Sequence, residues 1–434
     1  MFLLFIINLY VLRIFKSEIT LNFERQYDSY PFTKENLFSN LFYNYLIVKI
    51  NIGSNKQEIP LMLKFYEYNT FIIGIEVPEK NLTKFNNNTS STFKYIKEKA
   101  EYYVMTRFEF AYQSEDSLYL NNKEYKNYEF LLVKALSETY KIYKLIGGGV
   151  IGLNKYLSTS QGIDKYHFIS MLKEKNYIDS YSFTFKFLDK NKGQIILGNE
   201  PHEYDKNYKE KNYLKIRTQN INDNLCYSIV FDNIISKNFE FNEYLKAGIV
   251  LENGFIISVK KYKDYLDDIF FNEKMKEGIC DKEKKRFLEF SNYLYLYSCD
   301  ETLDTSKIPD LTFELKQMEM NFTFNEKDLW FNFEGRKYFL IIFQEYGNYW
   351  ILGEPFLRKY QIIFNQDDST LGYYNLNYKK PTSFFYILNW IFVILLFIIV
   401  LCLGAYIFII LKNKPKRKIA NELIEEEYKD ISKI

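Results

Sequence analysis

The chain has 434 residues, enough for two domains of ordinary size that each bury a hydrophobic core. Its 57 Lys and Arg residues nearly balance its 55 Asp and Glu residues, so the net charge of +2 gives no sign of a nucleic-acid-binding protein. The sequence has no P-loop, no glycine-rich dinucleotide motif and no Cys/His cluster with metal-ligand spacing, so we expect neither a metal nor a cofactor.

The chain begins with an apolar run, Met1–Leu12, that is too short to span a bilayer. Its length is typical of the apolar core of a secretory signal, so we predict a signal peptide at residues 1–17. The alternative is an uncleaved N-terminal core strand or anchor. Residues 18–42 are then interpreted as a short N-terminal segment before the first strand.

Two β-forming runs, Tyr45–Ile52 and Glu58–Leu63, flank a turn at Gly53–Lys56, and this pattern predicts a hairpin. Two further blocks are apolar runs that end in glycine. One is Gly147–Gly152, and the other is Trp350–Gly353. Short alternating runs of this kind favour a strand-dominated protein.

The order of these blocks resembles that of the pepsin-like aspartic proteases over roughly residues 43–378. The Gly53 turn is similar to the Ile-Gly-Thr-Pro-x-Gln hairpin of that family. Trp350–Gly353 is similar to the Trp-Ile-Leu-Gly block that supports the catalytic loop of the C-terminal lobe. The resemblance implies an all-β dominated, bilobal pepsin-like fold, with an N-terminal lobe at 43–205 and a C-terminal lobe at 206–378.

The resemblance also implies a catalytic Asp in each lobe, and neither is present. In register with the family, Lys64 stands at the first catalytic position and Leu251 at the second. Gly152 and Gly353 would be the paired supports of the two loops. In this family two close carboxylates share one proton, and one activates a water while the other donates to the peptide carbonyl. Lys64 and Leu251 can do neither at neutral pH.

The neighbouring residues leave one alternative open. Glu252 stands where a threonine hydroxyl ties the two catalytic loops together in the family, and Phe65 stands at the matching position. A shifted dyad of Glu67 and Glu252 would require both loops to be rebuilt. Otherwise these carboxylates are solvated or pair with Lys64. Zymogens of this family usually carry a longer, basic propeptide over the cleft, and none is evident in this sequence.

The four cysteines and two histidines are assigned no catalytic role. The resemblance implies a disulfide between Cys280 and Cys299. We interpret Cys226 as a buried small side chain, because no histidine lies near it in sequence. His167 and His202 have no Ser or Cys nucleophile nearby in sequence, so we interpret both as packing or surface residues. Glycosylation is possible at four Asn-x-Ser/Thr sites, Asn81, Asn87, Asn88 and Asn321.

The C-terminal part contains an uncharged apolar run at 384–411 that is long enough to cross a bilayer. Basic residues follow at once, so the positive-inside rule places the tail, 412–434, in the cytosol. We therefore predict a single-pass type I membrane protein of the secretory pathway with a lumenal or extracellular ectodomain. Tyr428 and Ile431 resemble a tyrosine-based sorting signal, although the segment could also be simply solvated.

The sequence is compatible with three functions. The first is an inactive, membrane-anchored pepsin-like protein that binds a peptide or protein in its interlobe cleft. The second is an active membrane-anchored aspartic endopeptidase with an unconventional dyad. The third is a trafficking receptor whose function lies in its tail.

Overall fold

The computed structural model describes residues 19–27, 33–43, 45–100, 108–136, 146–155, 166–221, 225, 227–237, 239–286, 293–375, 392–409, 421 and 423–425. The chain divides into two units, Met1–Asn377 and Tyr378–Ile434. The predicted signal peptide, Cys226 and the predicted sorting residues Tyr428 and Ile431 lie outside the described residues.

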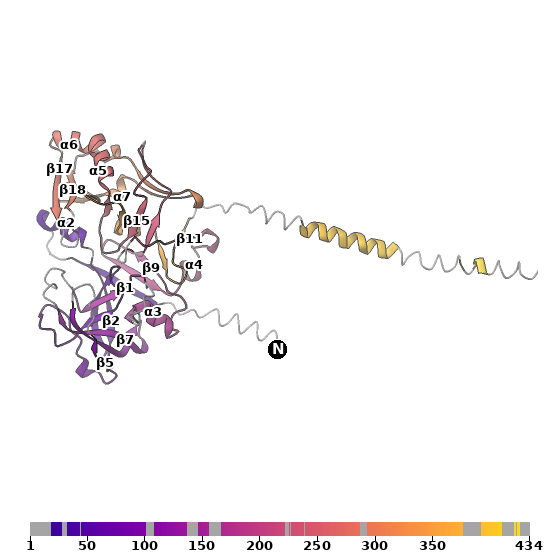
Figure 1. The fold of residues 1–434 in the computed structure, drawn as a ribbon, viewed down its shortest axis with the longest axis horizontal. Coiled ribbons are helices and arrows are strands. Elements are labelled where there is room, and N and C mark those ends of the chain that lie inside the picture. Colours follow the sequence, from indigo (N-terminus) through magenta and orange to yellow (C-terminus); the bar gives the residue numbers. More distant parts are fainter. Residues whose placement is uncertain are drawn as a thin grey trace, which may run out of the picture. The chain divides into compact units, whose positions relative to one another are not determined.

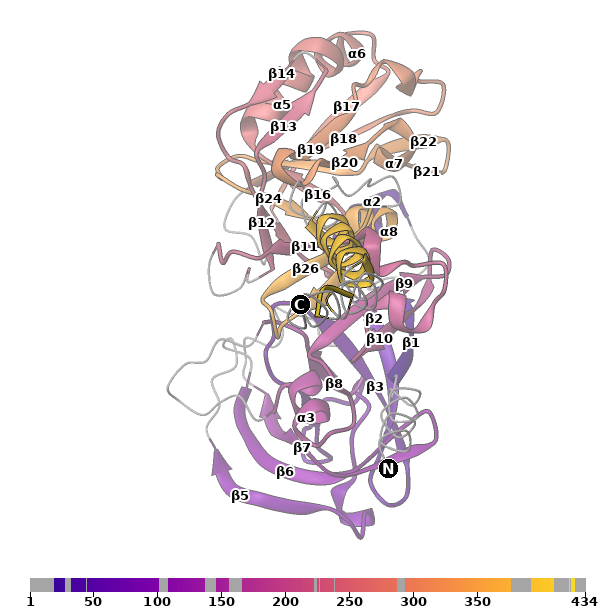
Figure 2. The same ribbon diagram turned by 90° about the vertical axis from the view of Figure 1, so that its right-hand side faces the viewer.

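The described part of the first unit contains three sheets (Figures 1 and 2). The largest has thirteen strands in the order β11-β26-β25-β9-β10-β1-β2-β3-β8-β4-β7-β6-β5. Its strands are β1 Ile19–Gln26, β2 Tyr45–Ile52, β3 Gln57–Lys64, β4 Phe71–Ile73, β5 Lys94–Ala100, β6 Phe108–Leu120, β7 Lys123–Leu136, β8 Gly149–Gly152, β9 Ser182–Phe187, β10 Lys192–Leu197, β11 Tyr213–Arg217, β25 Ile363–Asn365 and β26 Thr370–Tyr374.

The other two sheets belong to the C-terminal half of this unit. A nine-stranded sheet has the order β12-β15-β24-β16-β23-β18-β22-β21, with β17 paired to β18, and a four-stranded sheet has the order β14-β13-β19-β20. Their strands are β12 Ser228–Val230, β13 Asn233–Ser236, β14 Phe239–Phe241, β15 Lys246–Ile249, β16 Ile256–Ser258, β17 Cys280–Arg286, β18 Tyr293–Asp300, β19 Leu311–Leu315, β20 Met320–Phe324, β21 Trp330–Phe333, β22 Arg336–Phe339, β23 Ile341–Gln344 and β24 Trp350–Leu352.

Short helices connect these strands. The α-helices are α2 Lys34–Phe42, α3 Phe168–Glu174, α4 Pro201–Tyr204, α5 Lys260–Leu266, α6 Asn272–Lys276, α7 Glu326–Leu329 and α8 Glu354–Lys359, and a π-helical turn, η5 Asp267–Phe271, joins α5 to α6. The 3-10 turns are η1 Asn87–Thr89, η4 Glu210–Asn212, η6 Thr305–Lys307 and η7 Lys316–Met318.

The same pairing pattern occurs twice, once in each half. β3 runs parallel to β8, which is antiparallel to β4, which is parallel to β7. In the second half β15 runs parallel to β24, which is antiparallel to β16, which is parallel to β23. Figure 2 shows these two halves as separate β bodies joined by the strands around β9 and β10. The predicted strand-dominated, bilobal pepsin-like fold is therefore confirmed.

The predicted hairpin forms with nearly the expected bounds. Its two strands are β2 and β3, and Ile52 pairs with Gln57 at the turn. Gly53 adopts a φ of +83°, which glycine reaches without the steric cost of a Cβ atom. The N–H of Lys56 donates to the Gly53 carbonyl at 2.9 Å and closes the turn. The local sequence therefore predicts both the hairpin and its turn correctly.

The expectation that residues 18–42 precede the first strand is wrong. Ile19–Gln26 forms β1, which lies between β10 and β2 in the large sheet. Helix α2 follows it and begins with a capping box, in which Thr33 and Asn36 each accept a hydrogen bond from the other's backbone N–H. The apolar face of β1 supplies the strand signal, because Ile19, Leu21 and Phe23 alternate with polar residues and are buried.

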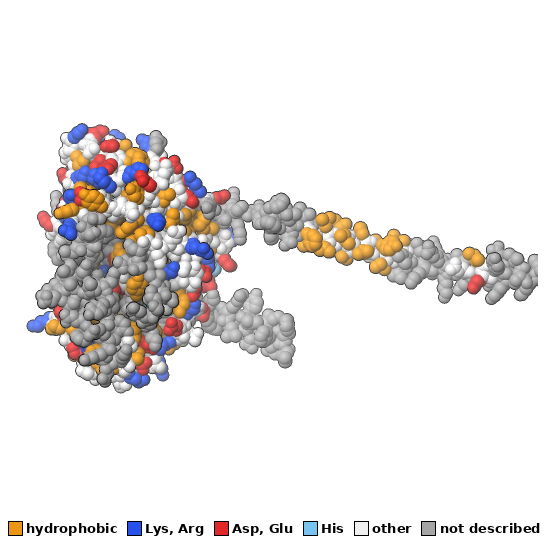
Figure 3. Space-filling model, in the orientation of Figure 1, with side chains coloured by type: hydrophobic (Ala, Val, Ile, Leu, Met, Phe, Trp, Pro, Cys, Tyr) orange, Lys and Arg blue, Asp and Glu red, His pale blue; other side chains and the backbone are white. Residues whose placement is uncertain are grey.

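Two further predictions are confirmed. A disulfide joins Cys280 to Cys299, which face each other across β17 and β18. In the second unit, the helix Phe392–Ile409 is long and apolar enough to cross a membrane. Figure 3 shows hydrophobic side chains along the visible face of this helix. The flanks of the predicted span, 384–391 and 410–411, lie outside the described residues.

Candidate functional site

The candidate site consists of two loops that follow corresponding strands in the two lobes. The first, at 65–70, leads from β3 to β4, and the second, at 250–255, leads from β15 to β16. A glycine-ended strand lies between the two strands of each loop, β8 in the N-terminal lobe and β24 in the C-terminal lobe. Each loop therefore crosses over a central strand.

Gly152 and Gly353 lie where backbone packs directly against these loops. A Cβ atom on Gly152 would lie 2.6 Å from the Tyr68 carbonyl oxygen. One on Gly353 would lie 2.2 Å from the carbonyl oxygens of both Asn253 and Phe255. Because real Cβ atoms do not approach backbone this closely, the close packing at both positions requires glycine. Gly152 and Gly353 thus each pack directly against the backbone of the loop in their own lobe.

Glu252 connects the two loops. Its Oε1 accepts a hydrogen bond from the backbone N–H of Phe65 and another, at 3.2 Å, from that of Tyr66. The side chain is buried, and burial raises the pKa of Glu252 above its ordinary value of 4.5, although Lys64 and the two amides act in the opposite direction. Its Oε2 is also buried and has no hydrogen-bond partner within the described part of the chain.

Lys64 is the last residue of β3, and Leu251 lies in the second loop, two residues after β15 ends. Lys64 is buried, and its Nζ lies over the ring of Tyr45, 5.4 Å from the ring centroid. It also interacts electrostatically with Glu252. Leu251 is completely buried. The structure thus places the buried Lys64 within electrostatic reach of the Glu252 carboxylate.

Phe65, which neighbours Lys64, is packed away from the loops. Its ring contacts the rings of Phe364, Tyr227, Phe185 and Phe183, with centroid distances of 5.0 to 6.0 Å. This aromatic cluster anchors the first loop to the sheet that joins the lobes. The first loop also contacts the C-terminal lobe through Tyr66, which packs against the apolar cluster that contains Val250 and Phe255.

Glu67, the other residue considered for a shifted dyad, is also buried. Its main-chain carbonyl accepts a hydrogen bond at 2.9 Å from the N–H of Asn154, which follows β8. This contact fixes the backbone of the first loop against the strand that crosses it.

Helix α2 lies on the second loop, and sequence reasoning missed this contact. Leu37, Phe38, Leu41 and Phe42 are buried in one apolar cluster with C-terminal-lobe residues that include Val250 and Phe255. The carbonyl oxygen of Leu41 lies 1.8 Å from where a Cβ atom on Gly254 would be. Figure 1 shows α2 at the junction between the lobes. Residues 34–42 are therefore part of the packing around the second loop.

The sequence contains a helix pattern at the position of α2, but the pattern is short. Its apolar residues recur at i, i+1, i+4 and i+5, and a Thr cap precedes them. A nine-residue helix with so brief a pattern is marginal by itself and depends on tertiary packing for its stability.

The two histidines are structural in their contacts. His167 is buried at the start of α3, where its Nδ1 accepts a hydrogen bond from the N–H of Ser170. Its Nε2 donates to the Asn154 carbonyl at 3.1 Å, and burial lowers the pKa of His167 to about 4. His202 contacts the Tyr374 hydroxyl at 2.5 Å. Among the described residues, no group of three or more His, Cys, Asp or Glu side chains could hold a metal ion.

Two β lobes, each with a loop crossed by a glycine-ended strand, define the class of bilobal pepsin-like proteins. The chain belongs to the eukaryotic aspartyl protease family, whose family model matches residues 44–375. A comparison with curated proteins finds no match.

Proposed function

We propose that this protein is a membrane-anchored, pepsin-like binding protein without proteolytic activity. The observation that carries the proposal is the set of side chains at the two loops, where Lys64 and Leu251 stand at the catalytic positions implied by the family. Peptide hydrolysis by this family needs two carboxylates that exchange one proton. An ammonium cannot act as the base, and a leucine never titrates.

Glu252 does not restore the missing chemistry by itself. Its Oε1 is engaged by the amides of Phe65 and Tyr66, so this oxygen holds the backbone. A general base must reach the proton that it removes and have an orientation set by its neighbours. The Glu67 and Glu252 dyad remains the alternative function, and it would need Glu252 to leave these amides.

The cleft is proposed to take a peptide or protein ligand, and α2 limits how this can occur. The helix already packs on the C-terminal-lobe loop through Leu41 and Phe42. An external ligand on this side would have to displace α2, whereas one on the N-terminal-lobe side would not. If Leu37→Asp, which detaches α2, strengthens ligand binding, the ligand binds on the C-terminal-lobe side where α2 packs.

The membrane anchor is proposed to be the helix Phe392–Ile409, in a type I orientation with the tail in the cytosol. Tyr428 and Ile431 are proposed to direct sorting from that tail. The function as a whole is tested by incubating the full chain with a diverse peptide library, for which we expect no pepstatin-sensitive cleavage.

A further inference from the structure

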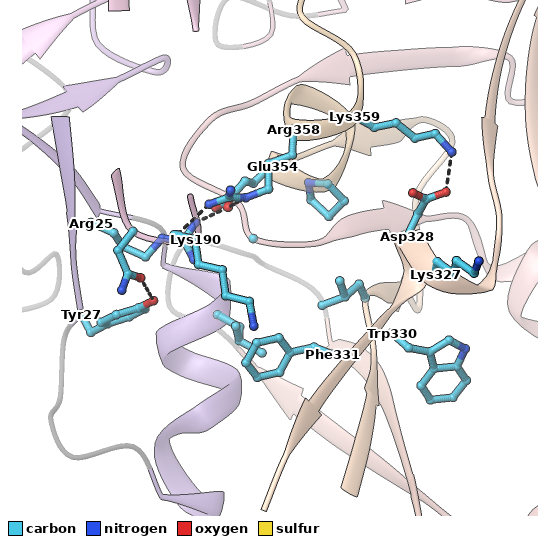
Figure 4. A pocket seen from close by; sticks show the side chains of 15 residues that line it. Arg25, Tyr27, Lys190, Lys327, Asp328, Trp330, Phe331, Glu354, Arg358 and Lys359 are labelled. Atoms are coloured by element: carbon cyan, nitrogen blue, oxygen red, sulfur yellow. Dashed lines mark hydrogen bonds and ion pairs between the residues drawn. The ribbon is translucent and has the colours of Figure 1, made fainter. Parts of the chain in front are cut away.

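A cavity of about 710 Å³ lies beside β1, α2 and α8. Gly254 of the second loop lines it, but Lys64, Leu251 and Glu252 do not. Its wall combines cationic side chains with aromatic rings, as Figure 4 shows. The volume lies in the range of pockets that bind drug-sized molecules. The chemistry of the wall therefore indicates what kind of molecule it could hold.

The inner wall carries two guanidinium groups that share one carboxylate. Arg25 and Arg358 both donate to Oε1 of Glu354, and the side chains of Arg25 and Glu354 are only 10% and 6% exposed. Although burial opposes its charge, the Glu354 carboxylate raises the pKa of Arg25 above its ordinary value. A second carboxylate that acts on Arg358, that of Asp189, is exposed and does not line the cavity, so the inner wall of the cavity carries two cations against one carboxylate. An anion in the cavity would balance that excess charge.

One donor of this cluster is also unused. The Nε atom of Arg25 is buried and has no hydrogen-bond partner among the described residues. Arg358, by contrast, uses its two Nη atoms on the carbonyls of Asp189 and Lys190, each at 2.7 Å. A buried guanidinium N–H without an acceptor is costly, and an acidic head group would satisfy it.

The rim adds two exposed lysines. Lys359 pairs with Asp328, but within the described part of the chain neither Lys190 nor Lys327 has a carboxylate partner. The Nζ of Lys190 lies over the ring of Phe331, 5.6 Å from its centroid. The rim is therefore positively charged, and Lys190 lies where the charged part of the wall meets the aromatic ring of Phe331.

The remaining wall is apolar and partly buried. Phe331 and Trp330 stand on β21, and Leu41 of α2 and Leu340 complete this side. We propose that the cavity binds an anionic amphiphile, with its carboxylate or phosphate head group at Arg25, Arg358 and the rim lysines. Its apolar chain or ring lies against Trp330 and Phe331.

The test uses the full chain in nanodiscs of zwitterionic lipid and follows tryptophan fluorescence. The chain has three tryptophans; Trp350 is buried in the core and Trp390 falls in the predicted span, so Trp330 is the one that lines the cavity. The probes are octanoate, octyl phosphate, octanol and inorganic phosphate. We expect saturable binding of the two charged amphiphiles, with a signal that Trp330→Phe abolishes.

Charge variants supply the matched comparison. Lys190→Gln with Lys327→Gln should weaken octanoate and octyl phosphate binding about fivefold, because two partly exposed charge contacts are lost. Lys209→Gln, which changes an exposed lysine that does not line the cavity, should leave binding unchanged. Equal binding of octanol and octanoate, equal binding of phosphate and octyl phosphate, no saturable response, or a double variant that matches Lys209→Gln would each overturn the proposal.

Discussion

The carboxylate of Glu252 accepts a hydrogen bond from the backbone N–H of Phe65, and this contact joins loops that lie 187 residues apart in sequence. The family's threonine hydroxyl would make such a contact with a short, neutral side chain. Here a longer and ionisable side chain makes it, beside the buried Lys64. The Glu252 side chain thus holds backbone N–H groups of the opposite loop, and its charge depends on pH.

Truncating Glu252 should destabilise the ectodomain. Glu252→Ala removes the acceptor of the Phe65 and Tyr66 amides, and we expect a loss of about 2 kcal/mol in the free energy of unfolding. Glu252→Gln keeps an oxygen that can accept both bonds, so its loss should be smaller. Denaturant unfolding measures both. An alanine variant as stable as the wild type would show that the contact contributes nothing.

The charge of Glu252 should make stability depend on pH. Below pH 4.5 the carboxyl is protonated in both states and contributes nothing. As the pH rises above 4.5, the unfolded state ionises first because the folded pKa is raised, so the folded state loses stability. The stability of Glu252→Gln relative to the wild type should therefore increase from about pH 4.5 towards pH 7. A difference that is flat over this range would argue against a raised pKa.

His167 should make the folded state less stable as the pH falls, whereas Glu252 makes it less stable as the pH rises. Its folded pKa of about 4 lies below the ordinary value of 6.5, so the unfolded state binds the proton first as the pH falls. Stability should decrease between these two values by about 3 kcal/mol, and His167→Gln should remove this part of the slope. His202→Gln is the matched histidine control. If both variants keep the full slope, His167 is not its source.

Gly353→Ala should be strongly destabilising, by about 3 kcal/mol or more, because its Cβ would overlap two carbonyl oxygens. Gly248→Ala on the adjacent strand β15 is the control. Its Cβ would meet only the Leu225 side chain, at 3.1 Å, and this side chain can shift. Thermal unfolding compares the two variants, and equal melting temperatures would mean that the loop moves freely away from β24.

The features that the sequence predicted correctly are local. The β2–β3 hairpin follows from a turn glycine between two β-forming runs, and the apolar helix Phe392–Ile409 follows from composition alone. The features that it missed depend on contacts between distant residues. The position of α2 depends on a C-terminal-lobe surface that includes Phe255, and the cavity combines Arg25 with Arg358. Neither pattern is visible along the chain.

The role of Glu252 shows the same limit within the site itself. The resemblance placed this residue at the position that ties the loops, but no local pattern says whether a glutamate there would face solvent, pair with Lys64 or reach the opposite backbone. That outcome depends on how far apart the two loops lie, and they belong to strands of different lobes.

The central claim is that the two loops cannot hydrolyse peptides. Its test compares the protein with and without α2 packed on the second loop, so that an effect of the helix can be separated from an effect of the loops. The measurement is cleavage of a diverse peptide library from about pH 3 to about pH 8 by the wild type and by Leu37→Asp with Leu41→Asp, which detaches α2. The account predicts no pepstatin-sensitive cleavage by either protein, because Lys64 and Leu251 remain in both. Cleavage by the wild type that survives repurification would contradict the claim and favour the Glu67 and Glu252 dyad. Cleavage by the α2 variant alone would contradict it too, because the helix rather than the loops would then suppress activity.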